Sequence, residues 1–171
     1  SVDAVETEQL RRAVDALLGA RRVVVAAFGG SAPVGLDLTH KLLKQGIVAT
    51  FYSDSHMQVM AATVFGPGDV LVAVSHSGNS RDIVEALAVA RERGATTLLI
   101  TGFPLSPAAK VADITLVAVA REREYQTDSI TSRIVQLAVI DTLYIAMIFA
   151  QKEAALTTVR ETSVAAAKKK L

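Results

Sequence analysis

A regular alternation of short apolar runs with longer amphipathic runs constrains the fold of this chain more than any other feature. The apolar runs are rich in valine, isoleucine and leucine, and glycine, proline or polar residues bound them, which is typical of buried strands. We expect five strands, at residues 22–28, 47–52, 70–74, 97–101 and 114–119. Strands that alternate with helices form right-handed βαβ units and a parallel sheet covered on both faces. The pattern therefore predicts an α/β fold, a three-layer sandwich around a five-stranded parallel sheet.

The stretches between the expected strands have helical periodicity. Gly19 ends an N-terminal helix, Pro33 stands near the start of the second helix, and Gly46 follows that helix. A third helix is expected at residues 55–65 and a fourth from residue 80, with only a short turn or helix at 106–109. The apolar side chains of the third helix are expected to point inward: Met57, Met60, Ala61 and Val64.

The C-terminal part of the chain has no glycine or proline after Pro107. Residues 129 to about 151, and their continuation to 171, are therefore predicted to be helical. The apolar residues of this helix occupy more of its circumference than one sheet face can cover: Ile134, Leu137, Ala138, Ile140, Leu143, Tyr144, Met147 and Ile148. We therefore expect a homodimer or a larger assembly such as a tetramer, with Arg133 placed to reach a neighbouring subunit's ligand site.

The expected connections fit the flavodoxin-like strand order 2-1-3-4-5. In that order the chain leaves strand 1 toward one side and strand 3 toward the other, which opens a ligand crevice above their carboxyl ends. Two loops are therefore expected to border a ligand site, at residues 29–31 and 75–80.

The loop at residues 75–80 reads Ser-His-Ser-Gly-Asn-Ser and leads directly into a helix. Free N–H groups and the positive end of the helix dipole favour anions at such a position, and Gly78 lets the backbone approach one closely. Because the loop has no lysine or arginine, the hydroxyl and N–H groups of Ser75, Ser77 and Ser80 would have to hold a phosphate.

A simpler interpretation of the same loop is helix capping. Asn79 or Ser80 would then cap the helix, with Asn79 and Asp82 as a box-like pair. The position of the loop at the crevice favours a binding site, with His76 as a further candidate contact.

The first loop reads Phe28-Gly29-Gly30-Ser31, and we expect Gly30 and Ser31 to face the crevice. This loop does not match the Gly-x-Gly-x-x-Gly fingerprint of dinucleotide-binding domains, because the third glycine is misplaced and no acidic residue ends the second strand. It also lacks the Gly-Lys-Ser/Thr of a P-loop. A small phosphorylated ligand is therefore favoured over a nucleotide.

The sequence does not favour a metal site or a cofactor site, and it suggests only limited roles for the histidines. The chain has no cysteine, and its three histidines fall in separate elements without metal-ligand spacing. We expect no metal and no cofactor. His40 is expected at a solvated position, whereas His56 and His76 fall at carboxyl ends of strands and are candidate contacts to a ligand hydroxyl.

The distribution of charge and the hydropathy pattern indicate which partners and which cellular location to expect. The 18 basic and 17 acidic residues are spread along the chain, so we expect no DNA binding by this chain alone. Residues 134–150 are apolar, but Gln136, Asp141 and Thr142 interrupt them, which favours a core or interface helix over a membrane span. With no signal-peptide pattern at the N-terminus, we expect a cytoplasmic protein.

At this point the motifs allow a family comparison. The Ser-His-Ser-Gly-Asn-Ser loop after an apolar strand, with Phe28-Gly29-Gly30-Ser31 upstream, resembles the sugar isomerase (SIS) domain. Further stretches resemble the effector domain of RpiR-family bacterial transcriptional regulators: Lys41-Leu42-Leu43, Phe51-Tyr52-Ser53-Asp54 followed by His56 and Gln58, and Ser132-Arg133-Ile134-Val135-Gln136-Leu137.

The resemblance implies a single domain over residues 1–171, in which a sheet core at 22–120 binds a sugar phosphate or sugar acid phosphate. Residues 1–20 resemble the helix that links this domain to a helix-turn-helix domain, and residues 129–171 form the C-terminal helices. The strand 3 serines, Ser75, Ser77 and Ser80, would hold the phosphate, and Ser31 would meet the sugar. No DNA-binding domain is present in this sequence, so we expect an excised effector domain or a shortened relative.

Two functions from different classes remain open. One is a non-catalytic ligand sensor; the other is an aldose-ketose isomerase, which needs a general base to move a proton between adjacent carbons. Enzymes of the superfamily often have glutamate where this chain has Asn79, and an amide cannot take that proton. Asp82, His76 or His56 could substitute, but we favour the sensor and expect no catalytic residue. A third possibility, a purely structural oligomer, would leave the loop at residues 75–80, the serine loop, unexplained.

Overall fold

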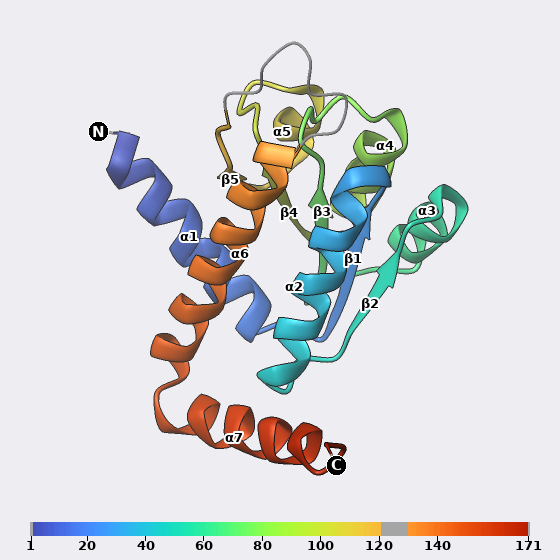
Figure 1. The fold of residues 1–171 in the computed structure, drawn as a ribbon. Helices are drawn as coiled ribbons and strands as arrows, with labels where there is room; N and C mark the ends of the chain where they lie inside the picture. The colour runs from blue at the N-terminus through green and yellow to red at the C-terminus, as the bar shows by residue number, and fades with distance from the viewer. Residues whose placement is uncertain (1, 121–129, 171) are drawn as a thin grey trace.

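The structure is a computed structural model that describes residues 2–120 and 130–170. The elements follow one another as α1 (Val2–Leu18), β1 (Arg22–Ala27), the 3-10 turn η1 (Gly29–Ser31), α2 (Ala32–Lys44), β2 (Ala49–Tyr52), α3 (Ser55–Thr63), β3 (Asp69–Val74), α4 (Arg81–Glu92), β4 (Thr96–Thr101), α5 (Pro107–Val111), β5 (Ile114–Val117), α6 (Ile130–Gln151) and α7 (Glu153–Ala167). The strands form one parallel five-stranded sheet in the order β2-β1-β3-β4-β5, as predicted (Figure 1).

The sheet lies between two helical layers. Alternate residues of β1 face opposite ways: Val25 belongs to a core with α1, α2 and α6, whereas Val24 belongs to a core with α3, α4 and α5. All six residues of β3 are buried, which is typical of a central parallel strand. The three-layer sandwich is confirmed, and the carboxyl ends of the strands share one edge of the sheet.

The prediction for the inward face of α3 was wrong for three residues. Met57, Met60 and Val64 are exposed, whereas Gln58 and Ala62 are buried. The phase of this nine-residue helix is set by polar bonds: Asp54 accepts from the Met57 N–H at 2.9 Å, and Gln58 Nε2 donates to the Tyr52 carbonyl at 2.8 Å. The amide of Gln58 thus occupies the inner face that the methionines were expected to fill.

The C-terminal region is helical, as predicted, but in two pieces. Lys152, with φ of 54°, separates α6 from α7, while the expected start at residue 129 lies outside the described residues. In the part of the chain that the structure describes, α6 is the one helix long and apolar enough to cross a membrane. Its buried residues Ile140, Leu143 and Met147 pack in the core with α1 and α2.

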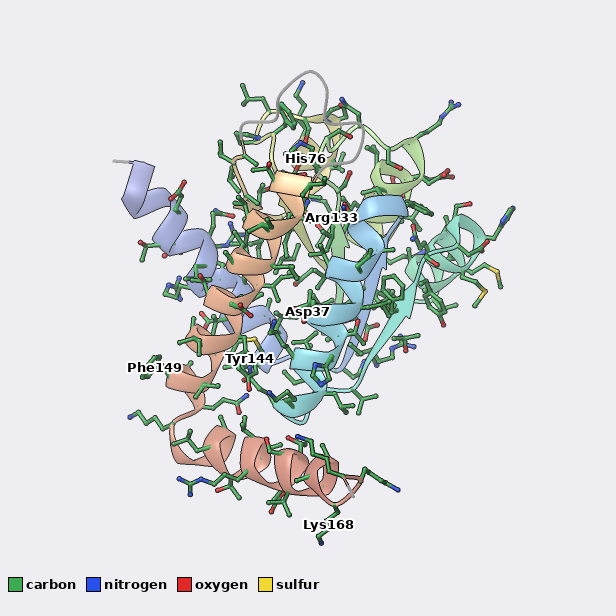
Figure 2. The ribbon with its side chains drawn as sticks, viewed as in Figure 1. Asp37, His76, Arg133, Tyr144, Phe149 and Lys168 are labelled. Carbon is green, nitrogen blue, oxygen red and sulfur yellow. The ribbon has the colours of Figure 1, made fainter. Side chains whose placement is uncertain are left out.

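Polar bonds hold α2 against α6 and α7. Lys41 of α2 pairs with Asp37 on its own helix and with Asp141 of α6. Burial lowers the pKa of Lys41, but the two carboxylates outweigh burial and leave that pKa raised. Gln45 Nε2 donates to the Tyr144 carbonyl at 3.2 Å, and Thr162 Oγ1 donates to the Lys44 carbonyl at 3.3 Å. Figure 2 labels Asp37 and Tyr144 on the two facing helices.

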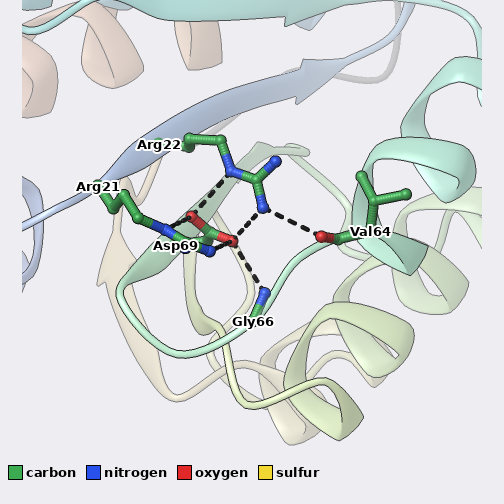
Figure 3. Close-up of polar contacts among 5 residues, drawn as sticks. All are labelled: Arg21, Arg22, Val64, Gly66 and Asp69. Atoms are coloured by element: carbon green, nitrogen blue, oxygen red, sulfur yellow. Dashed lines mark hydrogen bonds and ion pairs between the residues drawn. The ribbon is translucent and has the colours of Figure 1, made fainter.

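A buried carboxylate organises the opposite, amino-terminal edge of the sheet (Figure 3). Asp69 is fully buried at the start of β3 and accepts from Arg22 at 2.7 Å, from Arg21 at 3.0 Å and from the Gly66 N–H at 2.8 Å. The Arg22 hydrogen bond is the main reason why the pKa of Asp69 lies well below its usual range. No local pattern predicted this network, which joins β1, β3 and the loop that precedes β3.

Candidate functional site

The loop at residues 75–80 follows β3 directly and is held by its own hydroxyl groups. The Ser75 N–H donates to the Ile100 carbonyl at 3.0 Å and so extends the ladder between β3 and β4. Ser75 Oγ accepts from the Gly78 N–H, and Ser77 Oγ accepts from the Asn79 N–H, both at 3.2 Å. Each of the two hydroxyls therefore helps to shape the loop.

The helix that follows begins without a side-chain cap. Ser80 is the N-cap residue of α4, and among the described residues its side chain makes no capping hydrogen bond. The capping interpretation is therefore wrong for Ser80. The first turn of α4 keeps the N–H groups and the dipole that favour an anion.

Gly78 is required at its position. Its φ is +63°, in the left-handed region, and a Cβ there would lie 2.1 Å from Ser106 Oγ and 2.5 Å from Ser106 Cβ. The Ala108 N–H donates to the Gly78 carbonyl, and the Gly102 N–H donates to the His76 carbonyl, both at 3.0 Å. The residues between β4 and α5 thus support the serine loop from one side.

The side chains of the loop differ in exposure. Ser75 is buried with 8% of its surface exposed, His76 and Ser80 are half-buried, and Ser77 and Asn79 are exposed. The His76 ring stands edge-on to Phe103, with ring centroids 5.3 Å apart. His76 therefore packs against the loop that follows β4.

The first loop approaches the same edge of the sheet. Gly29 to Ser31 form a 3-10 turn, and α2 begins at Ala32 with a proline in its first turn. A Cβ at Gly30 would meet no atom within 4 Å, so this glycine leaves open space above the turn. Ser31 is half-buried at the N-cap position, and among the described residues its side chain makes no capping hydrogen bond.

The remaining candidates lie around these two loops. Asp82 is exposed in the first turn of α4. Arg133 is half-buried in the first turn of α6 and lies at the same end of the molecule as His76 (Figure 2). His56 lies farther out, after the edge strand β2, with its side chain 90% exposed and Nδ1 4.0 Å from Asp54 Oδ1. His40 is exposed, as expected.

Two features at this end of the molecule were not predicted from the sequence. Gln136 on α6 is fully buried, and among the described residues neither polar atom of its amide has a hydrogen-bond partner. Its position inside an apolar stretch was the only signal. The second feature is a pocket of about 360 Å³ beside the serine loop, lined by Ser77, Asn79, Phe103, Pro104, Leu105, Ser106 and Pro107. No group of three His, Cys, Asp or Glu side chains that could hold a metal occurs among the described residues.

Two solved structures resemble the chain over most of its length. The sugar isomerase domain of an RpiR transcription factor from Sphaerobacter thermophilus is 32% identical, with a TM-score of 0.80, over 91% of this chain and 86% of that chain. The NanR protein of Vibrio vulnificus, complexed with ManNAc-6P, is 26% identical, with a TM-score of 0.87, over 93% of this chain and 60% of that chain.

The sequence comparisons agree with this likeness. An uncharacterised HTH-type transcriptional regulator of Caldanaerobacter subterraneus is 37% identical over 153 residues, which is 90% of this chain and 54% of that protein. The chain spans about half the length of the curated regulators that it matches. The SIS domain family matches residues 16–146. The chain therefore belongs to the SIS domain family, and within it to the sugar isomerase domains of RpiR-type proteins.

Proposed function

We propose that this chain is the effector-binding domain of an RpiR-type bacterial transcriptional regulator that works in the cytoplasm and responds to a sugar phosphate or sugar acid phosphate. The observation that carries the proposal is the serine loop: hydroxyl groups and an uncapped helix N-terminus meet at the carboxyl edge of β3, next to β1. The Vibrio vulnificus NanR protein, of similar structure, was solved with a phosphorylated amino sugar, ManNAc-6P.

The hydroxyl groups suit this role because of the bonds they already make. Ser75 and Ser77 each accept one backbone N–H through an oxygen lone pair. A hydroxyl that accepts in this way still has its own proton to donate. Both serines can therefore donate to a phosphate, together with Ser80 and the N–H groups of the first turn of α4.

The sugar is proposed to extend from the serine loop toward β1. The open space above Gly30 lets a ligand approach the backbone, and Ser31 can bond a sugar hydroxyl. His76, Gly78 and Asn79 complete the proposed site as parts of the serine loop. Arg133 adds a cation at the same end of the molecule.

A sensor fits these residues better than an isomerase. Asn79 carries no titratable proton, and Asp82 and His56 are exposed to solvent. His76, the remaining candidate base, has its ring against Phe103. Among the described residues, the titratable candidates Asp82 and His56 therefore lack the shielding from water that tunes a base for proton transfer between adjacent carbons.

The proposed regulator acts as a homodimer or larger assembly. Large apolar side chains are exposed along the outer face of α6, at spacings of one helical turn or multiples of it: Ile130, Ile134, Ile145 and Phe149. The exposed fractions of Ile134 and Phe149 are 64% and 77%. Exposed apolar side chains that gather on one face of a helix are typical of an interface, and light scattering that shows a monomer at micromolar concentration would contradict the proposed assembly.

A ligand screen tests the proposal. Thermal shifts of the purified chain with sugar phosphates and sugar acid phosphates should single out binders, and each binder should then be incubated with the chain and followed by NMR. We expect a concentration-dependent rise in Tm without conversion of the sugar. Conversion would replace the sensor by an isomerase, and a screen with no binder would refute phosphosugar binding.

A further inference from the structure

A second pocket, the amino-edge pocket, lies at the amino-terminal edge of the sheet, whereas the serine loop borders the carboxyl edge. Its volume of about 270 Å³ lies just below the usual range for drug-sized ligands, so it suits a smaller molecule. Its walls come from β1, β2, the end of α3 and the residues next to them, and include Arg21, Arg22, Val48, Thr50, Val64 and Phe65.

Two apolar side chains that line the amino-edge pocket are exposed to water. Val48, just before β2, is 78% exposed, and Val64, just after α3, is 66% exposed. Val24 and Phe65, which belong to the core on the α3 side of the sheet, also line the pocket. The pocket therefore has an apolar wall, and a ligand that covers this wall gains free energy in proportion to the area it buries.

Two guanidinium groups line the same pocket and are held in place by a buried carboxylate (Figure 3). Arg21 donates to Asp69 through Nε and Nη2 at 3.2 and 3.0 Å, and Arg22 donates to it through the same two atoms at 3.0 and 2.7 Å. Arg22 Nη2 also donates to the Val64 carbonyl at 3.0 Å, and the Arg22 guanidinium lies 5.3 Å from the centroid of the Phe65 ring. The positions of both cations are therefore set by the fold, as specific binding requires.

The two guanidinium groups keep charge and hydrogen-bond donors for a ligand. The side chains of Arg21 and Arg22 are 62% and 47% exposed, whereas Asp69 is fully buried. The described residues that line the pocket include no aspartate or glutamate, so the carboxylate of Asp69 balances only one of the two positive charges. Among the described residues, the bonds above use Nε and Nη2 of each arginine, and the two N–H groups of each Nη1 remain for a ligand.

We propose that the amino-edge pocket binds a small monocarboxylate with a branched aliphatic or aromatic body. The carboxylate accepts from the Nη1 groups of Arg21 and Arg22, because the planar guanidinium group matches the geometry of a carboxylate. Its negative charge balances the positive charge that Asp69 leaves over. The apolar body lies against Val48 and Val64. This site and the proposed phosphosugar site are at opposite edges of the sheet, so the inference does not depend on phosphosugar binding.

Other anions suit the amino-edge pocket less well. The hydroxyl groups of a phosphosugar would face Val48, Val64 and Phe65, whose side chains offer no hydrogen-bond partner, and would lose their bonds to water. An inorganic anion would use the arginines but leave the apolar wall in water. An acid with an apolar body uses both the arginines and the apolar wall.

Three probes test the inference by isothermal titration calorimetry: 3-phenylpropanoate, its uncharged amide 3-phenylpropanamide, and acetate. We expect 3-phenylpropanoate to bind about tenfold or more tightly than the amide, because hydrogen bonds to an ionised group are roughly twice as strong as those between neutral groups. Acetate lacks the apolar body and should also bind about tenfold or more weakly than 3-phenylpropanoate. Added salt should weaken binding of 3-phenylpropanoate and leave that of the amide unchanged.

A charge variant tests the role of the arginines. Arg21→Gln leaves Asp69 its bonds to Arg22 and to the Gly66 N–H, so the chain should still fold, as circular dichroism can check. The variant should weaken binding of 3-phenylpropanoate about two- to fivefold, the range of an exposed ion pair, and leave binding of the amide unchanged.

Substitutions of exposed valines test the position of the apolar body. Val64→Asp places a carboxylate at the apolar wall and should weaken binding of 3-phenylpropanoate about fivefold or more. Val164→Asp, at a valine on α7 that is 55% exposed, is the matched control and should leave that affinity unchanged. Ser75→Ala with Ser77→Ala should also leave it unchanged, because the serine loop lies at the other edge of the sheet.

Several results would overturn the inference. Equal binding of 3-phenylpropanoate and its amide, or no binding of the acid at millimolar concentration, would rule out the carboxylate site. An affinity for the acid that Val64→Asp leaves unchanged would do the same, and this variant decides the question alone if Arg21→Gln does not fold. Loss of acid binding in Ser75→Ala with Ser77→Ala would place the acid at the serine loop and likewise overturn the inference.

Discussion

Replacing Gly78 by alanine should damage the serine loop without unfolding the chain. The new Cβ would meet Ser106 Oγ at 2.1 Å and Ser106 Cβ at 2.5 Å, distances that real Cβ atoms do not tolerate. Thr101 Oγ1, at 3.2 Å, leaves little room on the other side. Either the Ser106 segment or the serine loop must move.

Two contributions set the magnitude. A left-handed backbone costs a residue with a Cβ about 1–2 kcal/mol, and Gly78 has φ of +63°. Overpacking of a rigid site costs about 1–3 kcal/mol more. Gly78→Ala should therefore lower the free energy of unfolding by about 2–5 kcal/mol, which domains with 5–15 kcal/mol of stability often survive. Urea unfolding at 25 °C, followed by circular dichroism, measures the loss.

A double-mutant cycle and a control variant test whether a clash with Ser106 causes the loss of stability. Ser106→Gly removes both clashing atoms and the bond from the Ala109 N–H to Ser106 Oγ, and a change to glycine at an N-cap costs only about a few tenths of a kcal/mol. The double variant should still be more stable than the sum of the single losses predicts, by about 1 kcal/mol or more. Gly30→Ala, which meets no atom within 4 Å, should change stability by less than about 1 kcal/mol. Additive losses, or equal losses at Gly30 and Gly78, would refute the steric argument.

Ser75→Ala with Ser77→Ala should abolish most sugar phosphate binding in calorimetry. Because each hydroxyl accepts an N–H, the double variant should also lower the free energy of unfolding by about 1–3 kcal/mol. Unchanged affinity would contradict the proposed phosphate site. Gln136→Met should raise the Tm of the ligand-free chain, since it removes a buried amide whose two polar atoms lack partners among the described residues; a lower Tm would show that the amide is satisfied. Asp69→Asn should lower the free energy of unfolding at pH 7 by about 1–3 kcal/mol. Because Arg22 and Arg21 hold the pKa of Asp69 below its usual value, its stabilisation is present above about pH 4 and declines below it, so wild type and variant should converge in urea titrations at low pH. Ser80→Asp should stabilise α4 by about 0.5–1 kcal/mol and weaken phosphate binding at least tenfold, because a carboxylate there caps the helix and repels the ligand; tight binding by this variant would place the phosphate elsewhere.

The strand order, and with it the place of the serine loop at the sheet edge, could be predicted because both follow from local patterns and general topology. Five apolar runs separated by helical patterns permit few parallel arrangements, and right-handed crossovers leave the observed order with its crevice between β1 and β3. The strand ends differ from the prediction by one or two residues, as for Ala49 at the start of β2. The position of the serine loop followed directly from this order.

Contacts between distant parts of the chain could not be predicted. The phase of α3 depends on a bond from Gln58 to the end of β2, and apolar residues on both faces of a short helix do not reveal it. Asp69 pairs with arginines 47 and 48 positions away. Ser106, which lines the pocket beside the serine loop, lies against Gly78, and no local pattern encodes that contact.

Two features of the serine loop have opposite effects on the stability of the ligand-free domain. The bonds to Ser75 Oγ and Ser77 Oγ, and the support of Gly78 by Ser106, stabilise one loop conformation and so reduce the ordering cost of ligand binding. The N-terminus of α4, in contrast, forgoes the stabilisation of a side-chain cap at Ser80. On the proposed function, an anion bound there supplies the missing acceptors, and the free energy withheld from the empty domain adds to the affinity for the phosphate. A more stable helix start would then be a weaker anion site, which is the role that the proposal gives to an uncapping serine at position 80.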